Sequence, residues 1–114
     1  MSRHLRAALL FLLVAATALH AQEERESTKI YISADMEGLA GAVTGEQLAP
    51  DGFEYQRFRE FMTAEVNATI DAARAAGATE ILVSDSHGNG QNLLIEQLPD
   101  DVMIVRSWPR PLGM

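Results

Sequence analysis

The feature that most constrains the fold is one long amphipathic helix between two short strand-forming segments. Apolar residues recur along it at steps of three or four, which places them on one helix face: Phe58, Met62, Val66, Ile70 and Ala73. The pattern ends at Gly77, and the flanking residues 29–34 and 80–84 are short, apolar and rich in β-formers. This order predicts two parallel strands joined by a right-handed crossover. The sequence therefore predicts an α/β fold, a βαβ unit of a parallel-sheet domain that we expect to be incomplete.

Weaker signals fill in the expected elements around this unit. A turn at residues 50–52 leads into the long helix, with Asp51 as its N-cap and Glu54 three residues later completing a capping box. Residues 92–98 are expected to form a short helix, and residues 102–105 a third strand. The chain contains no internal repeat and no low-complexity tract.

Residues 1–21 have the composition of a secretory signal peptide. Two arginines precede an apolar run of 13 residues, 7–19, that no charge interrupts. A membrane span needs about 20 apolar residues, whereas signal peptides contain about 7–15, so a cleaved signal is favoured over an uncleaved anchor. Small residues allow cleavage after Ala18 or after Ala21, and the sequence leaves both open. We expect a secreted or periplasmic protein with no stable membrane anchor after cleavage, in which residues 22–28 form a solvated linker.

The charge and the cysteine content exclude several classes of partner and cross-link. The chain has 9 basic and 16 acidic residues, a formal net charge of −7, and loss of the signal peptide would leave 7 basic and 16 acidic residues. Binding to a nucleic-acid backbone requires clustered Lys and Arg, so no nucleic-acid partner is expected. The chain contains no cysteine, so after export any covalent or metal cross-link has to come from other ligands.

Metal-ligand side chains directly follow both predicted strands. Asp35 and Glu37 come after the first strand, and His87 follows the second within D-S-H-G. Ligands of open parallel sheets bind beyond the carboxyl ends of the strands, so these three residues are expected to share one site. Alternate side chains of extended backbone point the same way, so Asp35 and Glu37 can address one ion while Met36 turns into the core. Two carboxylates and an imidazole suit Zn²⁺ or a similar divalent ion.

Both motifs also have a purely structural explanation. A D-x-E pair after a strand can cap a loop, and D-S-H-G can form an Asx-type turn with a surface histidine. His4 and His20 belong to residues 1–21, so His87 is the only imidazole that residues 22–114 can offer. Other polar residues of the long helix are expected to be solvated or to form a charged outer face: Arg57, Arg59, Glu60, Glu65 and Asn67.

Three motifs together give a more specific resemblance. An S-x-D-x-E-G pattern occupies residues 33–38, an M-T-x-E-x-N helix segment residues 62–67, and an N/S-D-S-H strand end residues 84–87. In this order and at this spacing, residues 29–114 resemble the zinc-dependent D-aminopeptidases of the DppA type. The resemblance implies an exported metallopeptidase that releases N-terminal D-amino acids from short peptides. It also implies two zinc ions in one site and a homo-oligomer for the complete enzyme.

Motif matching assigns roles to individual residues. The resemblance implies that Asp35 bridges the two metal ions and that Glu37 and His87 are further ligands. Side chains beside these three are expected either to orient the ligands or to hold the turns in shape: Ser33, Asp85 and Ser86. Zinc is favoured over magnesium because an imidazole ligand suits zinc better.

The resemblance also implies ligands that this sequence lacks. In the family, a further His and Glu ligand and the His proposed to act in catalysis lie downstream of the matched region, so no catalytic residue is assigned here. We expect residues 29–114 to be the N-terminal part of such a domain. The alternatives are an inactive remnant that binds one metal weakly or none, and a binding module for small anions or peptides. The binding-module alternative has less support, because the sequence contains no glycine-rich phosphate loop of the G-x-x-x-x-G-K-S/T or G-x-G-x-x-G type.

Overall fold

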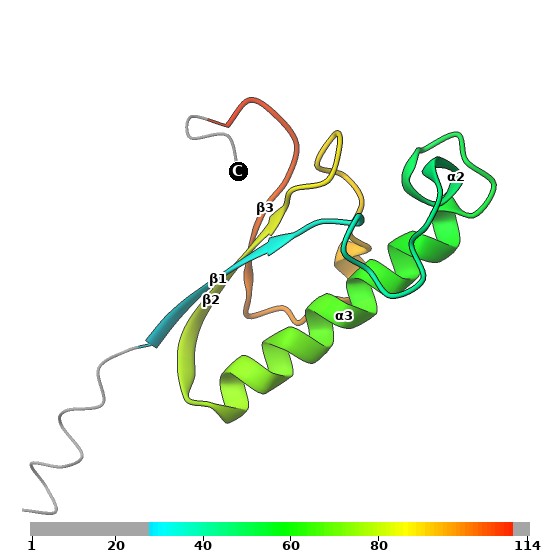
Figure 1. The fold of residues 1–114 in the computed structure, drawn as a ribbon. Coiled ribbons are helices and arrows are strands. Elements are labelled where there is room, and N and C mark those ends of the chain that lie inside the picture. The colour runs from blue at the N-terminus through cyan, green and yellow to red at the C-terminus, as the bar shows by residue number, and fades with distance from the viewer. Residues whose placement is uncertain (1–27, 111–114) are drawn as a thin grey trace, which may run out of the picture.

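The computed structural model describes residues 28–110, so the predicted signal peptide and nearly all of the predicted linker lie outside the described residues. Three strands, two α-helices and one 3-10 turn follow in chain order: β1 (Thr28–Ala34), α2 (Gly45–Leu48), α3 (Tyr55–Ala75), β2 (Ala78–Asp85), η1 (Ile95–Gln97) and β3 (Met103–Val105). Figure 1 shows the three strands side by side, with α3 packed across one face of the sheet. The predicted strand–helix–strand order is confirmed.

The sheet is parallel throughout, with β2 between β1 and β3. The register pairs Ile32 with Val83 and Ala34 with Asp85, so β1 and β2 end at the same level. The Ser86 N–H donates to the Ala34 carbonyl oxygen at 2.8 Å and continues the pairing one residue further. The segments that leave these two strands therefore start next to each other, and this positions the candidate site.

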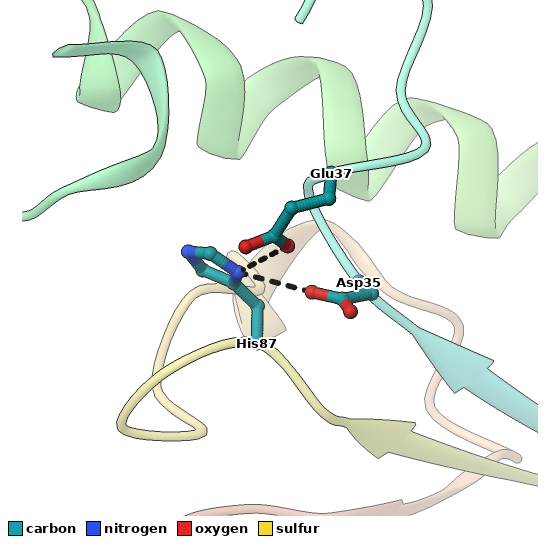
Figure 2. A group of neighbouring side chains, drawn as sticks. All are labelled: Asp35, Glu37 and His87. Carbon is teal, nitrogen blue, oxygen red and sulfur yellow. Dashed lines mark hydrogen bonds and ion pairs between the residues drawn. The ribbon is translucent and has the colours of Figure 1, made fainter. Parts of the chain in front are cut away.

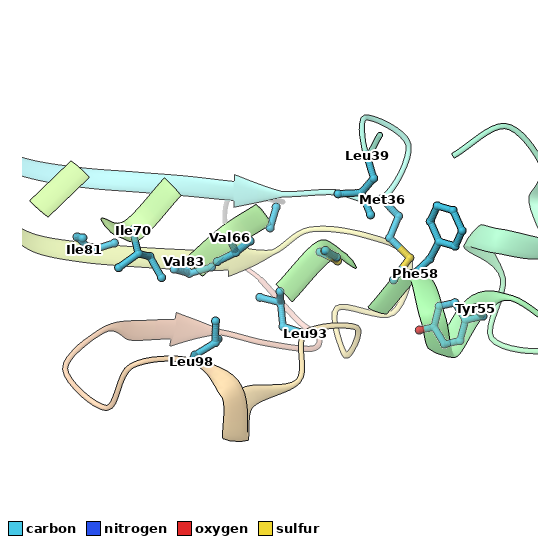
Figure 3. Packing of buried hydrophobic residues seen from close by; sticks show 12 residues of the cluster. Met36, Leu39, Tyr55, Phe58, Val66, Ile70, Ile81, Val83, Leu93 and Leu98 are labelled. Carbon is cyan, nitrogen blue, oxygen red and sulfur yellow. The ribbon is translucent and has the colours of Figure 1, made fainter. Parts of the chain in front are cut away.

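The core lies between the sheet and the apolar face of α3. Val66 and Ile70 of α3 pack toward Ile81 and Val83 of β2, and Ile70 and Val83 are fully buried (Figure 3). Complete burial of such a side chain contributes about 1.5–3 kcal/mol. The helical period of the sequence therefore predicted the buried face of α3 correctly. The apolar residues lie on that face because it is the one that packs against the strands.

The opposite face of the sheet is more open. Tyr31 of β1 and Met103 of β3 are 48% and 47% exposed, although both lie within strands. Within residues 28–110, no helix combines the length and the apolar character that crossing a membrane requires.

Helix α3 begins later than the sequence predicted. The predicted N-cap was Asp51, but the N-cap is Glu54 and the first helical residue is Tyr55. Gly52 N–H donates to the Ala49 carbonyl and Tyr55 N–H to the Gly52 carbonyl, so two consecutive turns occupy this segment. The Glu54 carboxylate is used elsewhere, because it accepts a hydrogen bond from the Gln47 amide at 3.0 Å. The C-terminal prediction is confirmed, since Gly77 follows the helix with a φ of +99°.

The other predicted elements are close to those observed. The predicted helix over residues 92–98 is only the 3-10 turn η1, and the third strand starts one residue later than expected. Helix α2 was not predicted, because four residues are too few to show a helical period.

Two polar residues of α3 do more than the solvated role predicted for them. Arg59 is half-buried and its Nε donates to the Asn92 carbonyl oxygen at 2.7 Å. Asn67 is also half-buried, and its Nδ2 donates to the Gln97 carbonyl oxygen at 2.8 Å. Both bonds tie α3 to the segment after β2, so the prediction of a simple solvated face was wrong at these positions.

Candidate metal centre

The three predicted ligand residues meet at the carboxyl ends of β1 and β2. Figure 2 shows Asp35 and Glu37 just after β1, with His87 reaching them from the loop after β2. His87 Nδ1 lies 3.0 Å from Asp35 Oδ1 and 2.9 Å from Glu37 Oε2. Met36, between the two acids, is fully buried, as the alternation of an extended backbone predicted.

The imidazole of His87 is held from both sides. Its Nε2 lies 2.8 Å from the carbonyl oxygen of Leu48, the last residue of α2, while Nδ1 faces the two carboxylates. The side chain is only 10% exposed, whereas those of Asp35 and Glu37 are more than half exposed. A metal-binding histidine typically donates its second ring N–H to a carbonyl or carboxylate, which fixes the tautomer. The Leu48 carbonyl could serve this purpose and would leave Nδ1 facing the two carboxylates.

The donor set fits a zinc ion. One ligand atom from each of the three side chains lies within 4.8 Å of the other two. Tetrahedral zinc with bonds of about 2.0–2.1 Å places its ligand atoms about 3.3 Å apart. The separations from Nδ1 to the carboxylate oxygens are slightly shorter, so a small outward movement of the exposed acids would accommodate the ion.

The contacts within the cluster change the acidity of two of its members. Burial of the ring opposes its positive charge, but the Leu48 carbonyl and the two carboxylates outweigh this effect and raise the pKa of His87. Partial burial opposes the negative charge of Asp35, but contacts with Glu37, the imidazole and the Met36 N–H outweigh it and lower the pKa of Asp35. With an acceptor at each ring nitrogen, the metal-free ring favours its doubly protonated form.

Zinc affinity is therefore expected to depend steeply on pH. Nδ1 must lose its proton before it binds a metal ion, so affinity should rise about tenfold for each pH unit below the pKa of His87 and then level off. Zinc titrations at several pH values measure this dependence. The H87Q variant should lose it, and a constant dissociation constant between about pH 5 and about pH 8 would contradict Nδ1 as a ligand.

A buried network shapes the loop that carries His87. Asp85 and Asn92 are almost completely buried, and the Asp85 carboxylate accepts hydrogen bonds from both the backbone N–H and the side-chain amide of Asn92. It also accepts the Leu93 N–H at 2.8 Å. The Asn92 amide donates in addition to the His87 carbonyl oxygen at 2.5 Å. Asn92 could not be predicted as part of this network, because the sequence shows it only as a polar residue close behind D-S-H-G.

The serines beside the cluster form a separate row of hydrogen bonds. Ser33 Oγ donates to Ser86 Oγ at 2.9 Å, and Ser86 Oγ donates to Ser84 Oγ at 3.0 Å. Arg110 Nη1 donates to Ser84 Oγ at 2.8 Å, and its Nη2 donates to the Asp85 carbonyl oxygen. None of these bonds reaches the three ligand-type side chains. Of the two roles expected for Ser33, Asp85 and Ser86, the hydrogen bonds favour holding the strand ends and the turn in shape.

A groove of about 280 Å³ opens next to Asp35, between the end of β1 and α3. Its walls include Leu39, Met62 and Val66, and Glu65 lies at its edge with Oε1 accepting the Ala40 N–H at 3.3 Å. A second hollow of about 340 Å³ lies among residues 45–53, and none of the three cluster residues lines it.

A parallel sheet that gathers two carboxylates and an imidazole at its strand ends defines an α/β protein with a candidate metal centre. Residues 28–114 match the family model for D-aminopeptidase. The chain therefore belongs to the D-aminopeptidase family, which confirms the resemblance seen in the three sequence motifs.

Two relatives show how much of the family's length the chain covers. A D-aminopeptidase of Bacillus subtilis is 36% identical over 86 residues, which make up 75% of this chain and 31% of that protein. The solved structure of the Zn-dependent D-aminopeptidase DppA from Bacillus subtilis, described as a self-compartmentalizing protease, superposes with a TM-score of 0.73 at 36% identity. That match covers 76% of this chain and 32% of the other. The chain thus spans about a third of the length of these relatives.

Proposed function

We propose that this chain supplies part of the metal centre of an exported, zinc-dependent D-aminopeptidase. Asp35, Glu37 and His87 are the proposed zinc ligands. The proposed reaction is hydrolysis of the peptide bond that follows an N-terminal D-residue in a short peptide. The family match and the zinc-dependent relative support the reaction class.

The observation that carries the proposal is the orientation of His87. Its Nε2 is engaged by the Leu48 carbonyl, so its Nδ1 is directed between the carboxylates of Asp35 and Glu37. The structural alternative, in which the two acids cap a loop and His87 lies at the surface, would not require a nearly buried ring with both nitrogens engaged. Two oxygens and one nitrogen converging on one point form a donor set typical of zinc.

The chain's own residues perform three tasks in this proposal. The two carboxylates supply negative charge that offsets the charge of a bound cation, and their exposure leaves the site open to a peptide. The Leu48 carbonyl keeps the proton on Nε2, so that Nδ1, once it has lost its own proton, would present its lone pair to the site. Bound zinc would acidify a water molecule and polarise the scissile carbonyl.

We further propose that the complete site holds two zinc ions. The family resemblance gives Asp35 the bridging position, where one carboxylate would reduce the repulsion between two dications. Three protein ligands do not saturate two ions. The remaining ligands are therefore proposed to come from the two-thirds of the relatives' length that this chain does not match. A homo-oligomer is proposed for the complete enzyme, by analogy with the relative described as self-compartmentalizing.

The proposal is tested by zinc content and by hydrolysis of D-alanyl peptides. Both are measured for this chain and for a form extended by any downstream coding sequence. We expect the extended form alone to hold about two zinc ions and to release D-alanine. E37Q should weaken zinc binding strongly in both forms, whereas E60Q, the same change on the exposed face of α3, should not. Peptide hydrolysis that survives zinc removal and E37Q would refute the proposed function.

Export is proposed from residues 1–21. Intact mass of the protein recovered from an expressing cell should show loss of either 18 or 21 N-terminal residues, the two cleavage points that the sequence allows. An intact N-terminus would contradict cleavage.

A further inference from the structure

The backbone of His87 is fixed by bonds that do not involve its ring. Its carbonyl oxygen accepts two hydrogen bonds, one from the Gly90 N–H at 2.9 Å and one from the Asn92 side-chain amide at 2.5 Å. The next carbonyl, that of Gly88, accepts a bond from Trp108 Nε1 at 3.2 Å. The peptide planes on the C-terminal side of His87 are therefore held in one orientation.

The loop needs such bonds because its sequence gives it little stiffness. Gly88 and Gly90 have φ values of +51° and +69°, a region that glycine enters without steric cost. Glycine also has the largest conformational freedom to lose, and neither residue has a side chain that packs. The direction of the His87 side chain is thus determined by the partners of the loop rather than by local preference.

Asn92 is the centre of those partners. It is 1% exposed, and both amide hydrogens are used, one by Asp85 and one by the His87 carbonyl. Its Oδ1 accepts a bond of 2.5 Å from the hydroxyl of Tyr55, the first residue of α3. Its carbonyl oxygen accepts the bond from Arg59. Asn92 therefore connects the end of β2, the His87 loop and the start of α3.

We propose that Tyr55 and Asn92 are positioning residues for metal binding. The Tyr55 hydroxyl fixes the rotation of the Asn92 amide, and the Asn92 amide fixes the His87 peptide so that Nδ1 faces Asp35 and Glu37. Neither residue touches the ion. This inference rests on the proposed function in so far as Asp35, Glu37 and His87 are the ligands, and it adds two residues from outside the cluster.

The Y55F variant tests the proposal with the smallest change available. It removes one hydroxyl and leaves the ring, which is 4% exposed and packs in the core. Loss of a direct partner of a metal ligand typically costs about 10–100-fold in affinity. Tyr55 acts on His87 through Asn92, so we expect the dissociation constant for zinc to rise by the lower end of this range, about tenfold. The Y31F variant is the matched control, because Tyr31 is 48% exposed on the open face of the sheet, and its affinity should not change.

A second measurement separates positioning from simple stability. In the zinc-free chain, ¹⁵N resonances of the His87 ring report its protonation pattern and its order, with assignment by comparison with H87Q. We expect one sharp set of signals in the wild-type chain and in Y31F, and broadened or doubled signals in Y55F. A purely structural role for Tyr55 would lower stability and leave these signals unchanged.

The outcomes distinguish this inference from the proposed function. A tenfold weaker zinc affinity together with altered His87 signals in Y55F supports the positioning role. Unchanged affinity with unchanged signals overturns it. If neither the wild-type chain nor its extended form binds zinc, the proposed function fails, and the ring signals alone still decide whether Tyr55 and Asn92 position His87.

Discussion

Replacement of His87 by glutamine is expected to raise the dissociation constant for zinc by more than about 100-fold, beyond the effect of losing an outer partner. The substitution removes the imidazole whose Nδ1 faces both carboxylates, and glutamine offers zinc no nitrogen lone pair. A direct zinc titration near neutral pH measures the change. Far-UV circular dichroism verifies that the variant keeps its helix and strands.

The chain offers a matched control for this experiment. E60Q also introduces a glutamine, on the exposed face of α3 and away from the cluster, and should leave the zinc affinity unaltered. If H87Q binds zinc as tightly as the wild-type chain, His87 is a structural residue. The zinc is then held by the two carboxylates without the imidazole, or at another place in the chain.

Replacement of Asp85 by alanine is expected to lower the free energy of unfolding by about 3–5 kcal/mol. Three buried donors, two from Asn92 and one from Leu93, would lose their acceptor, and each unsatisfied donor costs about 1–3 kcal/mol. Urea unfolding in the presence of a metal chelator measures the loss independently of zinc. In the same variant, the loop that carries His87 should lose its fixed conformation.

Asp71 provides the comparison for this second experiment. It is exposed on α3, so D71A removes a carboxylate without removing a buried acceptor. Its free energy of unfolding should change by less than about 0.5 kcal/mol. A loss of less than about 1 kcal/mol in D85A would mean that water replaces the carboxylate in the loop.

The sequence predicted the parts of the molecule that rest on periodicity. The spacing from Phe58 to Ile70 predicted the buried face of α3, and the strand-forming runs predicted two parallel neighbours. The site followed from the same pattern, because residues directly after neighbouring parallel strands have to meet. The sequence in this way predicted that Asp35, Glu37 and His87 lie together, and the structure brings them together.

Contacts between distant segments could not be predicted in the same way. The Leu48 carbonyl lies opposite His87 only because the end of α2 reaches the loop after β2, and no pattern in four residues reveals this. The sequence pattern did not single out Tyr55, and it placed Asn92 at the start of a short helix, although the two side chains bond to each other across 37 positions. The N-cap was misplaced for a related reason, since the bond from Gln47 to Glu54 depends on tertiary folding.

The parallel pairing of β1 and β2 has a consequence for how a bound metal ion would affect the stability of the chain. Glu37 and His87 touch across 50 positions of sequence, and α2 and α3 both lie within that interval. An ion held by both residues would close this interval into a ring, much as a disulfide restricts an extracellular chain. A chelator would then release the whole helical segment from that restraint, as well as emptying the site. The chain has no cysteine, so if it binds zinc as proposed, its resistance to unfolding would rise with the concentration of free zinc around it.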